Sequence, residues 1–256
     1  MRLAFPFLLV LLAAAPAWAA DDNAFTGQGG YEKCLEAVKS DARDAARAAE
    51  TWHLQGGGAA ALHCEALALT ALHRYAEAAT KLDQAALIAK GGSDLRIALY
   101  DQAGNAWLLA GAPQKAEASI NSALALAPKD EDILFDRARA RAAAKDWKGA
   151  DSDLSALLAE DPDRADAWVL RGSARHAEGR KAEAGADIAH ALQIYPSYPE
   201  ALVERGAMKL EAGDAAGARA DWLTVVRNQP NGDAAAAARQ HLSEMDAATA
   251  KPSSGN

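Results

Sequence analysis

This chain has few aromatic residues, few cysteines and no long apolar run, and these absences limit what it can be. Of 256 residues, 6% are aromatic and 50% are hydrophobic, and much of the hydrophobic share is alanine. That composition suits closely packed helices better than a bulky core. The chain also lacks an excess of basic residues, with a formal net charge of -8. Approach to a polyanion is therefore unfavourable, which argues against a nucleic-acid role.

The first residues are predicted to be an export signal rather than part of the fold. A positive start at Met1 and Arg2 is followed by an apolar run over residues 3–15 and a small-x-small cleavage site at residues 17–19. The run is shorter than the roughly 20 residues that span a bilayer. We therefore expect a signal peptide over 1–19, a periplasmic protein and no membrane insertion after cleavage. A buried helix and an uncleaved anchor are the alternatives.

Four prolines, each 34 residues after the last, mark a regular array. A fixed period in this range is typical of repeat proteins. Each proline is expected to end a helix, because it lacks an amide hydrogen and clashes inside one. The prolines are Pro128, Pro162, Pro196 and Pro230. They define units over 97–130, 131–164, 165–198 and 199–232, and residues 59–92 keep the pattern without the proline.

Small residues recur at fixed points of these units, on both of the helices expected in each. The two points are equidistant from the turn, so two antiparallel helices can approach closely there. The first helices carry Gly104, Ala138, Gly172 and Gly206, and the second helices carry Ala116, Ala150, Ala184 and Ala218. The turns are expected near Gly111, Lys145, Gly179 and Gly213.

This order of large residue, small residue, alanine, apolar residue and proline closely resembles the tetratricopeptide repeat (TPR). The resemblance covers residues 59–232 and implies an all-α, right-handed α-solenoid of helix hairpins. Around the repeats we expect a flexible leader over 20–30 and an irregular helical pair over 31–58. A capping helix over 233–245 and a disordered tail over 246–256 complete the expected organisation.

An arginine and an aspartate 16 residues later recur together in three units. The pairs are Arg137 with Asp153, Arg171 with Asp187, and Arg205 with Asp221. Unit 97–130 lacks both charges, and unit 59–92 reverses both signs with Glu65 and Lys81. Because the two positions face one another in an antiparallel hairpin, we predict ion pairs within each repeat in preference to a ligand-binding role.

A second basic series departs from the family pattern, whose aromatic slot holds Trp107 only once. The later units place Arg141, Arg175 and Lys209 there. Either these residues form a basic stripe that grips acidic side chains or a carboxylate, or their stems lie over alanine-rich helices with the charged heads in water. The second interpretation is favoured.

The two cysteines, Cys34 and Cys64, fall on the first helices of consecutive units. Such helices lie side by side in a helical solenoid, so we predict a disulfide in an oxidising compartment. The alternatives are a redox-active thiol pair and a metal site that uses His63. Neither has the expected spacing, and no metal is predicted.

The resemblance implies that first-helix residues line a concave binding face. The predicted set is Asp101, Asn105, Phe135, Arg139, Val169, Ser173 and His176. Asp101 stands where carboxylate-gripping members of the family need a base, which disfavours a dicarboxylate clamp. Phe135 and Val169 are candidate apolar anchors for an extended peptide or a partner helix. Ordinary solvated surface is the alternative.

Catalysis finds no support in the sequence, which carries no nucleophile motif, phosphate loop or carboxylate dyad in a special setting. We therefore predict a protein that is not an enzyme, needs no cofactor and acts as a periplasmic scaffold for a protein or peptide partner. A self-associating component of the cell envelope is the alternative. An enzyme acting on cell-wall material is less expected.

Overall fold

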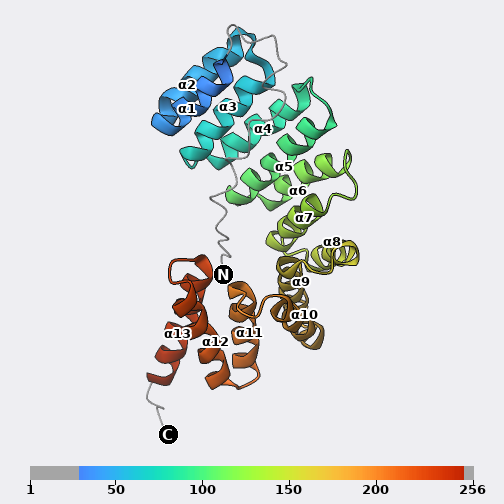
Figure 1. Cartoon of the computed structure of the whole chain (residues 1–256), viewed down its shortest axis with the longest axis vertical. Coiled ribbons are helices and arrows are strands. Elements are labelled where there is room, and N and C mark those ends of the chain that lie inside the picture. Colours follow the sequence, from blue (N-terminus) through green and yellow to red (C-terminus); the bar gives the residue numbers. More distant parts are fainter. Residues whose placement is uncertain (1–28, 251–256) are drawn as a thin grey trace. The chain divides into compact units, whose positions relative to one another are not determined.

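The computed structural model describes residues 29–250, which are helical almost throughout and contain no β-strand (Figure 1). The predicted all-α stack of helix hairpins is confirmed. No helix in this range is long and apolar enough to cross a membrane. The signal peptide and most of the leader, together with residues 251–256 of the tail, lie outside the described residues.

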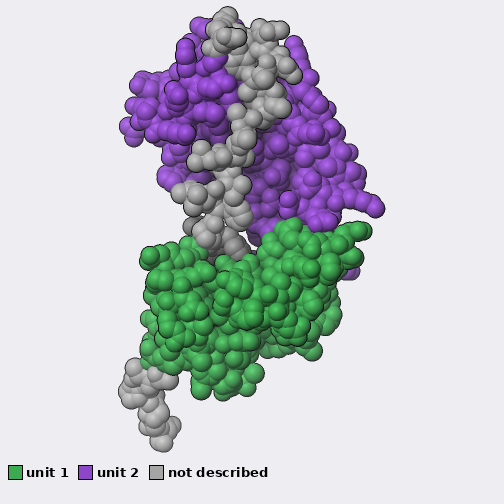
Figure 2. Space-filling view, in the orientation of Figure 1, with its two compact units in different colours: residues 1–12, 154–256 green, residues 13–153 purple. Residues whose placement is uncertain are grey.

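The chain forms two compact parts (Figure 2). We call residues 29–153 the N-terminal part and residues 154–250 the C-terminal part. The helices of the first are α1 (Gly30–Ser40), α2 (Ala42–Trp52), α3 (Gly58–Ala71), α4 (Tyr75–Ile88), α5 (Ser93–Leu109), α6 (Pro113–Leu124) and α7 (Glu131–Ala143). Helix α8 (Trp147–Glu160) spans the boundary. The second part has α9 (Ala165–Ala177), α10 (Lys181–Ile194), α11 (Pro199–Glu211), α12 (Ala215–Asn228) and α13 (Asp233–Ala250).

Each hairpin from α3 to α12 turns through a residue with left-handed backbone geometry. Three of the predicted turn residues are glycines with positive φ, at Gly111, Gly179 and Gly213. Lys145 adopts φ 65° at the equivalent place, and His73 adopts φ 58° in the turn between α3 and α4. Non-glycine residues in this region carry a steric cost. The hairpin geometry is thus retained in every unit, with or without glycine.

Small residues bring the two helices of a hairpin together as expected. A Cβ added to Gly104 on α5 would lie 2.4 Å from Cγ1 of Ile120 on α6. At Gly206 on α11, the same addition would lie 2.4 Å from Nε1 of Trp222 on α12. Both partner side chains are fully buried. Glycine at these points therefore makes room for a large residue on the facing helix.

The structure corrects three expected boundaries. Helix α1 begins at Gly30, which was assigned to the leader. Helix α5 begins at Ser93, four residues before the repeat was expected to start, because its first turn packs Leu95 against the core. Helix α13 continues to Ala250, so the first five residues of the predicted disordered tail are helical.

The added turns of α13 are held by contacts to the preceding hairpin. Met245 is buried in the core of the C-terminal part. Asp246 forms an ion pair with Arg219 on α12. Sequence composition alone suggested disorder here, and packing against α12 overrides it.

Candidate binding face on the first helices

A layer of charged side chains lies between the two helices of each hairpin. All four predicted ion pairs are present in the structure. Nη2 of Arg137 lies 2.8 Å from Oδ1 of Asp153, and the equivalent distances in the next two repeats, Arg171–Asp187 and Arg205–Asp221, are also 2.8 Å. The reversed pair joins Lys81 to Glu65 at 2.8 Å. Each arginine donates a second hydrogen bond to the same carboxylate through Nε, so the ion pair is bidentate.

The second basic series binds the same aspartates. Arg141 lies 2.8 Å from Asp153, Arg175 lies 2.9 Å from Asp187, and Lys209 lies 2.8 Å from Asp221. Arg141 also pairs with Glu117 on α6 at 2.9 Å. This arrangement differs from both interpretations of the sequence. The charged groups of Arg141, Arg175 and Lys209 do not point into water, and they do not form a stripe that could bind a carboxylate of another molecule. They complete the charged layer inside each hairpin.

Trp107 and Ser119 fill this layer where the ion pair is missing. The indole N–H of Trp107 donates to Oδ2 of Asp83 at 2.9 Å, and the Ser119 hydroxyl donates to Oδ1 at 2.7 Å. Asp83 belongs to α4, in the preceding repeat. Thus, in the four units over 97–232, the residue in the family's aromatic slot supplies a hydrogen-bond donor to an aspartate, whether it is tryptophan, arginine or lysine.

Cys34 on α1 and Cys64 on α3 form the predicted disulfide, with their Cα atoms 6.2 Å apart. The neighbouring His63 is buried between Tyr31, whose hydroxyl lies 2.6 Å from Nδ1, and Gln102, whose Oε1 lies 2.9 Å from Nε2. A neutral imidazole satisfies both contacts if Tyr31 donates to Nδ1 and Nε2–H donates to Gln102. Burial lowers the pKa of His63, which favours this neutral form.

His63 is thus engaged by two neighbouring side chains and is not placed with the cysteines as a metal ligand. Among residues 29–250, no group of three or more histidine, cysteine or acidic side chains could hold a metal ion.

In the N-terminal part, three of the four predicted face residues lie in one polar cluster. Arg139 donates from Nη1 to Oδ1 of Asn105 at 2.8 Å and to Oδ1 of Asp136 at 2.7 Å. Asn105 donates from Nδ2 to Oδ2 of Asp136 at 2.7 Å. Asp101 is in hydrogen-bond contact with Asp136 as well. Phe135, the fourth predicted residue, is half-buried beside this cluster on α7.

Burial is the main cause that raises the pKa of Asp101 to about 8, and the charge of Asp136 adds to it. The Oδ1 atom of Asp101 is buried and has no hydrogen-bond partner. Sequence reasoning missed Asp136. Its signal was the i,i+3 spacing to Arg139 on a helix whose register was known.

In the C-terminal part, the predicted anchor Val169 is only 7% exposed and packs into the hydrophobic core. The expectation of an accessible apolar anchor at this position is therefore wrong. Ser173 instead forms a hydrogen bond with Glu204 on α11, two repeats after Asp136. Burial raises the pKa of Glu204, and the hydrogen bond from Ser173 and the charges of His176 and His241 oppose that rise.

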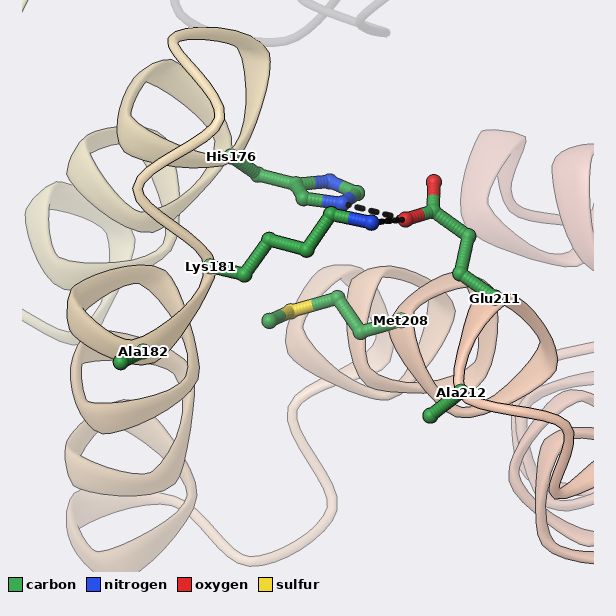
Figure 3. A pocket seen from close by; sticks show the side chains of 6 residues that line it. All are labelled: His176, Lys181, Ala182, Met208, Glu211 and Ala212. Atoms are coloured by element: carbon green, nitrogen blue, oxygen red, sulfur yellow. Dashed lines mark hydrogen bonds and ion pairs between the residues drawn. The ribbon is translucent and has the colours of Figure 1, made fainter.

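His176 lines a cavity of about 340 Å³ between the turn after α9 and the end of α11 (Figure 3). Nε2 of His176 and Nζ of Lys181 converge on Oε2 of Glu211, at 3.1 and 2.8 Å. Met208 points into the space below them. Glu204 and Glu211, like Asp136, were not predicted, although both lie on an expected first helix.

Comparisons with known proteins rest on structure. No protein-family model and no curated protein sequence matches the chain. The structure of YrrB, described as a TPR protein with an unusual peptide-binding site, is 19% identical, with a TM-score of 0.56 over 67% of this chain and 87% of YrrB. MamA (residues 41 to the end) from Desulfovibrio magneticus RS-1 is 20% identical, with a TM-score of 0.56 over 66% of this chain and 93% of MamA.

The APC/C hetero-tetramer Cut9–Hcn1 contains a chain that is 14% identical and has a TM-score of 0.57. That match covers 82% of this chain and 41% of the other. The repeat period, the observed hairpins and these likenesses agree, and the chain has the tetratricopeptide-repeat fold.

Proposed function

We propose that this protein is an exported, non-catalytic scaffold that binds a protein or peptide through the face of its first helices. The observation that carries the proposal is the cluster on α5 and α7, where Asn105, Asp136 and Arg139 join consecutive repeats. The side chains of Asp136 and Arg139 keep 15% and 16% of their surface exposed. They are therefore polar groups fixed on rigid helices and still open to a partner.

Two further observations support a binding role over catalysis. The arginines of the two repeating basic series are paired with aspartates inside the hairpins, where they hold helices together. YrrB, with the same fold, is described as having a peptide-binding site. The export signal expected over residues 1–19 supports a periplasmic location, which N-terminal sequencing of the protein from a periplasmic fraction would test.

Site-specific photo-crosslinking in the periplasm tests the binding role. A benzophenone amino acid replaces Phe135 on α7 in one variant, and it replaces the exposed Ala118 on α6 in a matched control. We expect a discrete adduct with another protein from position 135 and none from position 118. Equal adducts from both positions, or no adduct from either, would contradict the proposal.

Self-association is a second candidate function, favoured by two exposed leucines of the N-terminal part. Leu54 is 81% exposed and Leu87 is 70% exposed. Sedimentation of the wild type and of a Leu87→Asp variant distinguishes this role. A monomer at high concentration removes it, whereas an oligomer that the substitution dissociates supports it.

A further inference from the structure

Two aspartates from consecutive first helices meet on the proposed binding face. Asp101 lies on α5 and Asp136 lies on α7, in hydrogen-bond contact. Asp136 is held from both sides, because Oδ1 accepts from Arg139 and Oδ2 accepts from Asn105, each at 2.7 Å. The pair is therefore fixed in place by neighbours that are themselves bonded to each other.

The guanidinium of Arg139 is set against two carboxylates, Asp101 and Asp136. The cluster therefore lacks one positive charge. Oδ1 of Asp101 is the atom left without a partner. A buried acceptor with no donor costs about 1–3 kcal/mol, which is recovered if the partly exposed Asp101 side chain turns to meet a donor brought by another molecule.

The elements packed against α5 do not supply the missing charge. His63 on α3 is buried and its lowered pKa favours the neutral form, and Asp83 on α4 accepts from Trp107 and Ser119. On α6, Lys115 lies over the Trp107 ring and Glu117 pairs with Arg141. The bases of α7 other than Arg139 are directed to Asp153. The start of α7 adds further negative charge through Asp130, Glu131 and Asp132.

We propose that the Asp101–Asp136 pair is the anchor for a basic side chain, lysine or arginine, of the bound protein segment. This inference rests on the proposed function and names the chemistry of its partner. An ammonium or guanidinium group supplies both the missing positive charge and N–H donors for Asp101. The surrounding acids favour the approach of a basic segment and repel an acidic one.

A proton fills the same role when the partner is absent. Because the pKa of Asp101 is raised to about 8, this carboxyl is protonated at neutral pH. A basic side chain must displace that proton, so binding releases it. Affinity for a basic segment should then rise with pH, by up to about tenfold per pH unit, and level off above about pH 8.

Three fluorescein-labelled octapeptide amides test the inference on the purified full chain. They alternate alanine with lysine, glutamate or glutamine, and anisotropy is read near pH 6, pH 7 and pH 9. We expect the lysine peptide to bind in preference to the others and to bind more tightly as pH rises. Asp101→Asn should remove both the preference and the pH dependence. Asp94→Asn, at an exposed position of the same helix, should leave both unchanged.

The inference is overturned if the lysine peptide fails to bind at about 1 mM, or if its affinity does not change with pH. It is also overturned if the glutamate peptide binds equally or if Asp101→Asn leaves binding unaltered. Mapping the adduct formed from position 135 distinguishes failure of this inference from failure of the proposed function. A captured segment without lysine or arginine rejects the basic partner alone, whereas the absence of an adduct counts against the binding role itself.

Discussion

Trp107 donates its indole N–H to Asp83 at 2.9 Å, in the place where later repeats put an arginine or lysine against an aspartate. The acceptor belongs to the helix before the Trp107 hairpin, whereas the later aspartates belong to the helix after the base. The donor therefore occupies the same repeat position in each of these units. The aspartate that accepts lies on the preceding helix for Trp107 and on the following helix for the later basic residues.

The first prediction concerns this tryptophan. Trp107→Phe keeps most of the packing but leaves Asp83 with the Ser119 hydroxyl alone, so we expect a loss of about 1–2 kcal/mol. Urea denaturation followed by circular dichroism measures it. In an Asp83→Ala background the penalty should largely disappear. An undiminished penalty there would show that ring packing, not the hydrogen bond, is responsible.

The second prediction compares two equivalent ion pairs with different exposure. The Arg171 side chain is 11% exposed and the Arg205 side chain is 40% exposed. Arg171→Ala should cost about 3–5 kcal/mol, because it breaks a buried pair. Arg205→Ala should cost about 0–1 kcal/mol, because this arginine is solvated and Lys209 still neutralises Asp221. Equal losses in urea melts of the two variants would contradict this explanation.

The third prediction follows from the raised pKa of Asp101. The folded state retains this proton up to about pH 8, whereas an unfolded aspartate loses it near pH 4. The folded state thus binds more protons in this window, and the stability that Asp101 contributes falls as pH rises from about 4 to about 8. Asp101→Asn should remove that slope and stabilise the protein at pH 8. A variant with an unchanged pH profile would disprove it.

The fourth prediction concerns His63, whose effect has the opposite sign. Its pKa is lowered on folding by burial, so below about pH 6.5 the unfolded state binds more protons than the folded state. Stability should therefore decline as pH falls through that value. His63→Gln should flatten the acidic limb of the stability profile.

The fifth prediction concerns the Cys34–Cys64 disulfide, which closes a loop with a sequence separation of 30. On the chain-entropy model its loss costs about 3–4 kcal/mol. The cluster around it is small, with Cys34, Ala49 and Cys64 as its buried members. Replacing both cysteines by serine should therefore increase amide exchange mainly in α1–α3. Uniform loss of protection through α7 would show instead that the first helices support the whole N-terminal part.

The fold and the intra-hairpin contacts could be read from the sequence, because the 34-residue period defines which positions face one another across a turn. That register was sufficient to pair Arg137 with Asp153 and Glu65 with Lys81. It was also sufficient to bring Cys34 near Cys64 on neighbouring first helices.

Contacts that depend on how far one hairpin is rotated against the next could not be read in this way. Asp83 reaches into the following repeat, and Asp136 contacts Asn105 in the preceding one. Val169 shares the repeat position of Asp101 and Phe135 but is buried. Burial at one position thus differs between repeats, and the period alone does not predict it.

In the later hairpins, the ion pairs of the buried aspartates form within single repeat units, which affects how the array can gain or lose units. In units 165–198 and 199–232, the intra-hairpin aspartates Asp187 and Asp221 each have both of their cations on the first helix of their own unit. A genetic duplication or deletion of one such unit therefore carries this buried aspartate together with both of its cations. Asp83 of unit 59–92 instead accepts from Trp107 and Ser119 of unit 97–130, so loss of either unit alone would leave the other without its hydrogen-bond partners.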